Sequence, residues 1–160
     1  MTVMSPKRHA ARARAAASVL LVLFVLQWVS TAQSGEAESA AIRAVLDQQV
    51  AAWNRGDIEA FMRGYARSPE TTFVSGDRVT RGWQTVFDRY RRAYDTRAKM
   101  GQLAFSELEI ELLGNDVALV VGRWELKRAQ DAPHGRFTLV FRRLPEGWRI
   151  VHDHTSSASR

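Results

Sequence analysis

The stretch GNDVALVVGRWELKRAQDAPHGRFTLVFRRLPEGWRIVHDHTS, residues 114–156, decides the fold class. It is rich in β-branched and aromatic residues, and the segment just before it has the same character. The β-rich segments are 103–113, 117–128, 136–144 and 148–155. The tripeptides GND and PEG between them are typical of tight hairpin turns. Four segments joined in this way predict a four-stranded antiparallel meander.

The residues before this stretch show a different, helical spacing of apolar side chains. It predicts three helices, at 40–53, from Ile58 to about Tyr65, and at 83–94. Gly56 is suited to end the first helix and Asp57 to cap the second. TTFVS at 71–75 predicts a short strand, and GDRVTRG after it predicts a turn. The order predicts an α+β fold with three N-terminal helices on one face of a curved antiparallel sheet, enclosing a pocket.

The first 32 residues have the pattern of a signal peptide. A basic start is followed by the apolar run AAASVLLVLFVL at 15–26, and small residues at Ser30 and Ala32 mark a cleavage site. We therefore expect a signal peptide at 1–32, a linker at 33–39 and one domain at 40–157. The protein is expected to be exported, either periplasmic or secreted, and to contact a membrane only if the leader stays uncleaved.

The charge of the chain comes mostly from this leader. The whole sequence carries 23 basic and 17 acidic residues, a net charge of +6. The leader holds four basic residues and no acidic one, so the rest carries 19 basic and 17 acidic residues, a net charge of +2. This balance does not favour a nucleic-acid partner. The absence of cysteine excludes disulfides and a thiolate nucleophile.

The last β-rich segment holds the string His152-Asp153-His154. Strict alternation places Trp148, Ile150 and both histidines on one face of the strand, and Asp153 with Thr155 on the other. The aspartate therefore does not orient its neighbouring histidines.

A metal site at this pair of histidines needs a third ligand, and no Asp or Glu is placed by spacing to supply it. The serines have no nucleophile-elbow context, and no glycine-rich phosphate loop follows a strand. We predict no metal and no cofactor.

Asp153 and Arg123 are the candidates for catalysis. Both lie in β-rich segments with apolar flanks, where a charge is costly unless it is paired or faces a wet cavity. If both face one cavity, the carboxylate would accept a proton and the guanidinium would stabilise an anion. The alternative is a structural salt bridge between them.

Aromatic side chains are numerous on the predicted helices. Most are expected in the core, while Trp53, Tyr65, Trp83 and Tyr90 are suited to border a cavity and bind a small ligand. Trp124, in the second β segment, joins this set.

AAWNRGDIEAF, RGWQTVFDRY, GNDVALVVGRWEL and GWRIVHDHTS together resemble the nuclear transport factor 2-like superfamily. The chain is similar to its SnoaL-like families and to the association domain of calcium/calmodulin-dependent kinase II, over about 40–157. The resemblance implies a cone-shaped fold. It implies little about function, because the fold hosts isomerases, dehydratases, cyclases, binding domains and oligomerisation modules.

The resemblance also implies site residues. The kinase association domain has a similar His-x-His strand and a pocket lined by arginines. Arg123 falls on one arginine position, and Thr138 and Thr155 fall on two others. It implies that Asp153 and Thr155 face the cavity, with His152 and His154 on the outer sheet face at a ligand or subunit contact.

Three functions remain open. The first is an exported domain that binds a small, partly apolar molecule and forms a homodimer through the outer sheet face. The second is an acid–base enzyme of isomerase or cyclase type that uses Asp153 with Arg123 or a tyrosine. The third is an oligomerisation scaffold without catalysis.

Overall fold

The computed structural model describes residues 34–158, and the compact unit considered below begins at Ser39. The predicted signal peptide lies outside the described residues. The strands are β1 (Thr72–Ser75), β2 (Arg78–Arg81), β3 (Gln102–Leu112), β4 (Val117–Lys127), β5 (His134–Leu144) and β6 (Gly147–Thr155). They form one sheet in the order β2-β1-β6-β5-β4-β3. The predicted α+β class and the antiparallel meander of the last four strands are confirmed.

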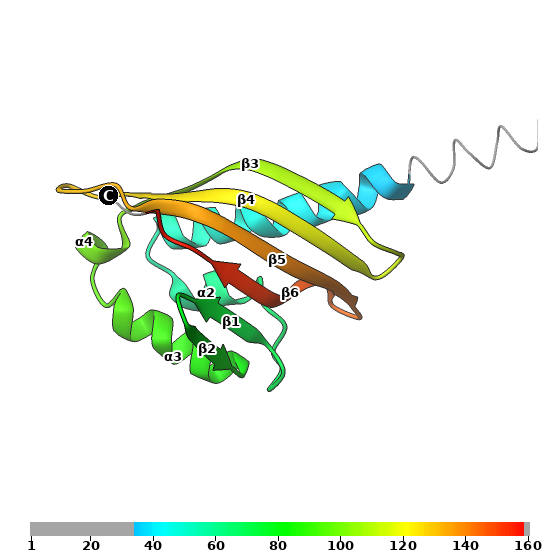
Figure 1. Ribbon diagram of the computed structural model, residues 1–160, viewed down its shortest axis with the longest axis horizontal. Helices are drawn as coiled ribbons and strands as arrows, with labels where there is room; N and C mark the ends of the chain where they lie inside the picture. The colour runs from blue at the N-terminus through cyan, green and yellow to red at the C-terminus, as the bar shows by residue number, and fades with distance from the viewer. Residues whose placement is uncertain (1–33, 159–160) are drawn as a thin grey trace, which may run out of the picture. The chain divides into compact units, whose positions relative to one another are not determined.

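Three helices occupy the positions that the apolar spacing predicts, and a fourth, short helix was not predicted. They are an N-terminal helix over residues 34–54, α2 (Ile58–Met62), α3 (Trp83–Ala93) and α4 (Arg97–Met100). Figure 1 shows the long strands β3 to β6 side by side, with α3 near the short strands β1 and β2 and the N-terminal helix behind β3 and β4. Residues 34–39, predicted as a linker, are helical; GEAESA contains good helix formers and two acidic residues suited to a helix N-terminus. Among the described residues, no helix is long and apolar enough to cross a membrane.

The turn between the N-terminal helix and α2 is fixed by two neighbouring residues. Gly56 has φ +88°, a conformation that side chains disfavour, and the amide of Asp57 donates to the carbonyl of Ala52 at 2.9 Å. The carboxylate of Asp57 then accepts a hydrogen bond from the amide of Ala60 at 2.8 Å and caps α2. The predicted roles of Gly56 and Asp57 are confirmed.

Strand β2 corrects the prediction that 76–82 is only a turn. Residues 78–81 pair antiparallel with β1, and β1 in turn pairs parallel with β6. The segment is short and mostly exposed, so its alternation carries little apolar signal. This hairpin extends the sheet beside α3.

Two bulges interrupt the pairing of the long strands. In β3 the register shifts between Ser106 and Glu109, and Glu107 has φ +51°. In β6 it shifts between the pairs Val140–His152 and Phe141–Ile150, so Val151 is the extra residue. Bulges bend a strand and increase its twist. They curve the sheet around the buried side chains.

The core lies between the helices and the inner face of the sheet. Ile42, Leu46, Met62, Val86, Val120 and Phe141 are fully buried. Next to these side chains lie buried aromatic and polar side chains, among them Trp53, Tyr65 and Asp153. That end of the inner face contains a cavity.

Candidate functional site

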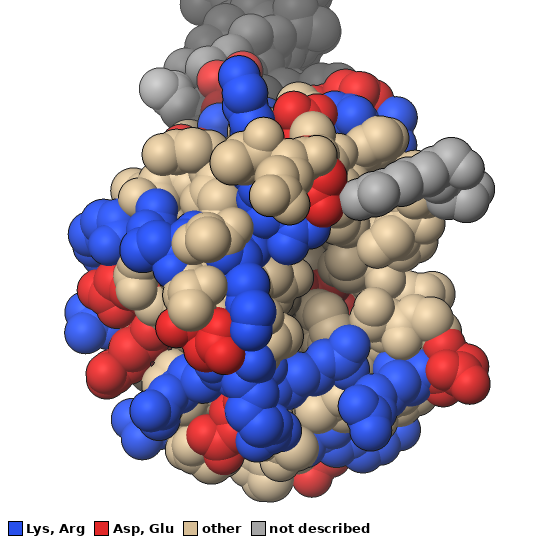
Figure 2. Space-filling view, turned by 90° about the vertical axis from the view of Figure 1, so that its left-hand side faces the viewer, with Lys and Arg blue, Asp and Glu red and all other residues tan. Residues whose placement is uncertain are grey.

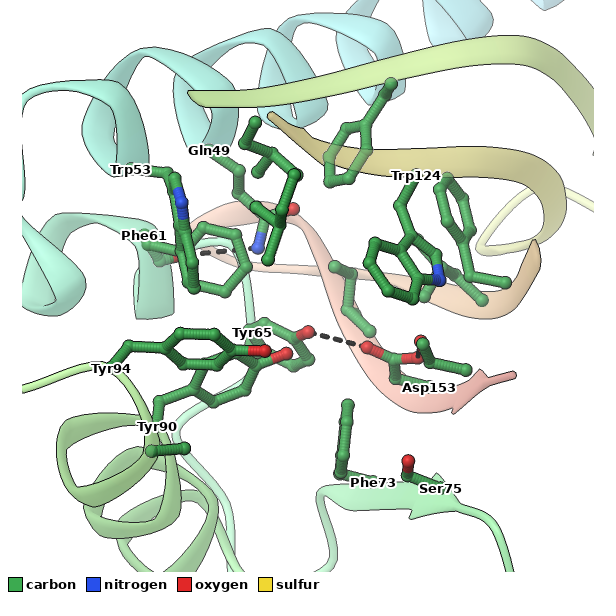
Figure 3. Close-up of a pocket in the computed structure, with 18 of the residues that line it drawn as sticks. Gln49, Trp53, Phe61, Tyr65, Phe73, Ser75, Tyr90, Tyr94, Trp124 and Asp153 are labelled. Carbon is green, nitrogen blue, oxygen red and sulfur yellow. Dashed lines mark hydrogen bonds between the residues drawn. The ribbon is translucent and has the colours of Figure 1, made fainter. Parts of the chain in front are cut away.

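A cavity of about 180 Å³ opens between the helices and the inner face of the sheet. Its wall is mostly aromatic and aliphatic, with a few polar groups. The aromatic lining residues are Trp53, Phe61, Tyr65, Phe73, Tyr90, Tyr94, Phe105, Trp124 and Phe137. Figure 3 shows the ring of Trp53 and the rings of Tyr90 and Tyr94 on the helical side, opposite Trp124 and Asp153 on the sheet. A wall of this composition suits a small organic molecule.

Asp153 is the acidic residue of the cavity wall, and it is 4% exposed. The hydroxyl of Tyr65 donates to its Oδ2 at 2.7 Å (Figure 3). The hydroxyl of Thr155 donates to its Oδ1 at 2.7 Å. A carboxylate oxygen has two lone pairs, so each oxygen keeps one for a further partner. The two hydroxyls hold the carboxylate in one orientation at the cavity wall.

Burial raises the pKa of Asp153 from its ordinary value to about 6. The hydrogen bonds from Tyr65 and Thr155 and the charge of His154 act in the opposite direction, because each favours the ionised form. A carboxyl group with a pKa near 6 exists in both protonation states close to neutral pH. It is therefore able both to accept and to donate a proton.

Tyr90 extends the polar cluster toward α3. Burial, with the charge of Asp153, raises the pKa of Tyr65 and of Tyr90 well above the ordinary value. Both tyrosines remain neutral hydrogen-bond donors over the physiological range.

The bulge at Val151 decides what β6 presents to the cavity. Ile150 and Asp153 both line it, although strict alternation places them on opposite faces. The prediction that Trp148 and Ile150 share a face with the histidines is therefore wrong, while the cavity position implied for Asp153 and Thr155 agrees with the geometry. Before the bulge, the inner face of β6 carries the core side chains Trp148 and Ile150. After the bulge, the same face carries Asp153 and Thr155.

The helical side of the cavity is anchored by side-chain hydrogen bonds to backbone carbonyls. Trp53 Nε1 donates to the carbonyl of Met100 at 3.0 Å, and Gln49 Nε2 donates to the carbonyl of Phe61 at 3.1 Å. The ring of Phe61 meets that of Trp53 edge-on at 5.1 Å between centroids. These contacts fix the aromatic wall before any ligand binds.

The rim of the cavity combines the C-terminal end of the chain with α3. Trp124 Nε1 donates to the carbonyl of Ser156 at 2.9 Å, and Ser157 joins the lining. From α3, Arg89 lines the cavity beside Tyr90. Figure 2 shows a recess on this side of the molecule, with basic side chains near its edge and acidic surface visible inside it.

The predicted site residues fall into two groups. With Asp153, the residues that line the cavity are Trp53, Tyr65, Tyr90, Trp124 and Thr155. Trp83, Thr138, His152 and His154 are not among the lining residues. Trp83 instead stacks on Phe87 and donates its Nε1 to the carbonyl of Met62 at 3.0 Å.

Thr138 and His154 are paired across β5 and β6, with side chains on the outer face of the sheet. His152 is beside them on that face and is half-buried, and burial lowers its pKa. The outer-face position that the resemblance implies for both histidines agrees with this geometry.

Arg123 does not lie in the cavity, which corrects the predicted pairing with Asp153. Strand β4 alternates so that Gly122 and Trp124 face inward, and Arg123 faces outward, where it forms an ion pair with Glu125 at 3.1 Å. The geometry therefore does not support a mechanism that uses Arg123 beside Asp153.

Sequence reasoning missed the polar lining residues Gln49, Ser75, Arg89, Tyr94 and Ser157. Helical spacing indicates the position of Arg89 at the cavity, because Val86, Arg89, Tyr90 and Ala93 are three or four residues apart and share a face. No signal of this kind marks Gln49 as a cavity residue.

No group of three or more His, Asp or Glu side chains within residues 34–158 is placed to hold a metal ion. The chemistry available at the cavity is that of one carboxylate, one guanidinium, one amide, three tyrosine hydroxyls and the hydroxyls of Ser75, Thr155 and Ser157.

Comparison with known proteins places this arrangement in a family. The model of the SnoaL-like domain matches residues 42–159. An NTF-2 like protein of unknown function from Shewanella oneidensis MR-1 is 38% identical, with a TM-score of 0.71 over 74% of this chain and 98% of that one. A comparison with curated proteins gives no match.

More distant solved structures share the fold. A ketosteroid isomerase-like protein from Erwinia carotovora atroseptica is 21% identical, with a TM-score of 0.62 over 76% of this chain and 96% of that one. A protein of the nuclear transport factor 2 (NTF2-like) superfamily from Salmonella enterica is 21% identical, with a TM-score of 0.59 over 76% and 94%. The chain therefore belongs to the SnoaL-like domain family of the NTF2-like superfamily.

Proposed function

We propose that the chain binds a small, largely apolar organic molecule in the cavity beside Asp153. The observation that supports this is a preformed aromatic cavity of about 180 Å³ with a polar cluster on one side. A cavity of about 150 Å³ holds benzene. The cavity is thus suited to one six-membered ring with a few substituents.

Binding is tested by calorimetry and thermal shift with ring compounds that carry a ketone, a hydroxyl or a carboxylate. Ala93 is an exposed residue at the cavity rim, so Ala93→Trp is expected to obstruct the cavity without disturbing the core. Arg92→Trp, one residue away on an exposed position, is the matched control. Stabilisation of the wild type and of the control, lost in Ala93→Trp, supports the proposal. No stabilisation by any compound would overturn it.

A second candidate function, proton transfer by Asp153, is favoured by the raised pKa of this buried carboxyl. Asp153 would take a proton from the carbon next to a ligand carbonyl, forming an enolate. If a carbon–carbon double bond lies next to that carbon, the intermediate is a dienolate, and returning the proton to its far carbon moves the double bond and completes an isomerisation. Tyr90 is placed to donate a hydrogen bond to the enolate oxygen, because its hydroxyl lies in the same polar cluster.

The exchange of C–H protons for deuterium tests this step. A cyclic ketone is incubated with the protein in deuterated buffer, and deuterium beside the carbonyl is followed by NMR. Asp153→Asn keeps the shape of the side chain and removes the base, so exchange is expected to fall by about 100-fold or more. Thr138→Val, on the outer face of the neighbouring strand β5, is expected to have no effect. Equal exchange with both variants would exclude Asp153 as the base.

We also propose that the outer sheet face binds a second copy of the chain and that residues 1–32 direct export. Half-buried apolar side chains, Leu119, Val121 and Val140, support the first proposal, since they lie on the face opposite the cavity. The leader pattern supports the second. Light scattering of the purified protein and mass analysis of its N-terminus test them. A pure oligomerisation scaffold is less favoured, because it does not need the cavity.

A further inference from the structure

Arg89 and Asp153 are the two charged residues of the cavity wall. They come from different elements, since Arg89 belongs to α3 and Asp153 to β6. Asp153 is accounted for by its hydrogen bonds and by the proposed proton transfer. Arg89 has no role in that step.

The guanidinium of Arg89 is held in place by the hairpin of β1 and β2. Its Nη1 donates to Thr80 Oγ1 at 3.1 Å, and its Cζ lies 4.9 Å from the centroid of the Phe73 ring. Phe73 and Thr80 are directly opposite each other in the hairpin. One hydrogen bond and one ring face therefore fix the plane of the guanidinium, and four of its five N–H groups remain beyond that bond.

The positive charge of Arg89 has no carboxylate partner among the described residues. No Asp or Glu oxygen in residues 34–158 lies within 4.0 Å of it, whereas Arg123, Arg128, Arg136 and Arg142 each pair with a carboxylate. An arginine that is half-buried, oriented and unpaired at a cavity wall is a ready site for an anion.

The two charges lie near each other in the cavity wall. Arg89 lies against the ring of Phe73 in β1, and Phe73 is directly opposite Asp153 in the neighbouring strand β6. Both Arg89 and Asp153 line the cavity. A ligand in the cavity is therefore able to contact the guanidinium with one group and the carboxylate with another.

We infer that the ligand is a small ring compound with a carboxylate, which Arg89 binds, and that its uncharged polar group meets Asp153. This rests on the proposed function and names its substrate class. The ionised Asp153 repels an anion, so the ligand carboxylate is excluded from that side and attracted to the other. The two charges would therefore set the orientation of the bound ligand.

The inference is tested with three compounds that share one ring. They are 4-oxocyclohexanecarboxylate, its carboxamide and its methyl ester. A charge-assisted, forked contact with the guanidinium is expected to make the carboxylate bind about tenfold or more tighter than the two neutral compounds. Affinities are measured by calorimetry with the purified protein at pH 7.5.

Arg89→Met removes the charge and keeps an unbranched side chain. It is expected to bring the carboxylate to within about twofold of the carboxamide, with the carboxamide affinity unchanged. Arg89→Lys restores the charge without the fork and is expected to recover part of the preference. Arg92→Met, an exposed arginine of the same helix, is the control and keeps the full preference.

The outcomes separate this inference from the proposed function. Equal binding of the three compounds by the wild type, abolished by Ala93→Trp, contradicts the inference and supports the cavity as a binding site. A carboxylate preference that survives in Arg89→Met also contradicts it. No binding of any of the three contradicts both. A preference lost in Arg89→Met and kept in Arg92→Met supports both.

Discussion

Ile150 and Asp153 lie on the same face of β6, although three positions separate them, because Val151 forms a bulge between them. Ile150 is 1% exposed, and Asp153 is 4% exposed. The bulge thus places a carboxylate at the end of an apolar surface, in a strand whose inner face is otherwise core. Bulges commonly redirect a side chain beside a functional site.

Asp153→Asn is expected to change how stability depends on pH. The pKa of Asp153 is raised in the folded state from 3.8 to about 6, so the folded state binds more protons than the unfolded state between these values. The contribution of Asp153 to stability is therefore largest below about pH 4 and falls as the pH rises to about 6. The shift corresponds to a loss of about 3 kcal/mol that Asn does not suffer. Urea unfolding of both proteins at pH 4, 5, 6, 7 and 8 measures it. Parallel curves for the two proteins would contradict the prediction.

Tyr65→Phe is expected to destabilise the protein more at pH 8 than at pH 4. The hydroxyl of Tyr65 donates to an ionised carboxylate at pH 8 and to a mostly neutral one at pH 4. Loss of a buried hydrogen bond to a charged group costs about 1.5–3 kcal/mol, against about 1 kcal/mol for a neutral pair. Urea unfolding at the two pH values gives the difference.

Tyr94→Phe is the control for this experiment, because Tyr94 lines the same cavity but does not influence the pKa of Asp153. Its cost is expected to be the same at both pH values. An equal cost for Tyr65→Phe at pH 4 and pH 8 would mean that its bond to Asp153 is not charge-assisted.

Gly122→Ala is expected to destabilise the fold by about 1–3 kcal/mol, because a new methyl group has no room. Its Cβ would lie 2.8 Å from Leu108 and closer still to the ring of Phe137, at the point where β4 faces the bulge of β3. Gly114→Ala is the control, since nothing lies within 4 Å of its added Cβ. Chemical unfolding compares the two, and an equal effect would show that the close packing at Gly122 is not limiting.

Val121→Asp is expected to dissociate the proposed dimer, because it places a charge in the apolar centre of the outer sheet face. Light scattering should give the mass of one chain for this variant and of two chains for the wild type. Arg92→Asp, on exposed α3, controls for the added charge. A wild type that is monomeric at micromolar concentration would refute the dimer.

Several features of the fold were predictable from the sequence because their signals are local. The turns GND and PEG, the glycine and aspartate between the first two helices, and the apolar spacing of α3 all lie within a few residues. The strand β2 was not predictable in this way, since its residues are exposed and its pairing depends on β1. Because β2 was not predicted, the hydrogen bond from Arg89 to Thr80 that orients the guanidinium was not predictable either.

The site was predictable in part. The aromatic residues Trp53, Tyr65 and Tyr90 follow from helical spacing. The bulge at Val151 does not follow from the sequence of β6 alone, because it arises from the pairing of β6 with β5. The outward position of Arg123 was readable, since Arg123 and Glu125 alternate with the inward Gly122 and Trp124.

Titration of the side-chain carboxyl carbon of Asp153 by NMR tests the central claim most directly, because it requires no knowledge of the ligand. The claim is that Asp153 is a buried base, held by Tyr65 and Thr155, that changes protonation state near neutral pH. It predicts a midpoint at about pH 6. A midpoint near 3.8, the ordinary value for aspartate, would contradict it.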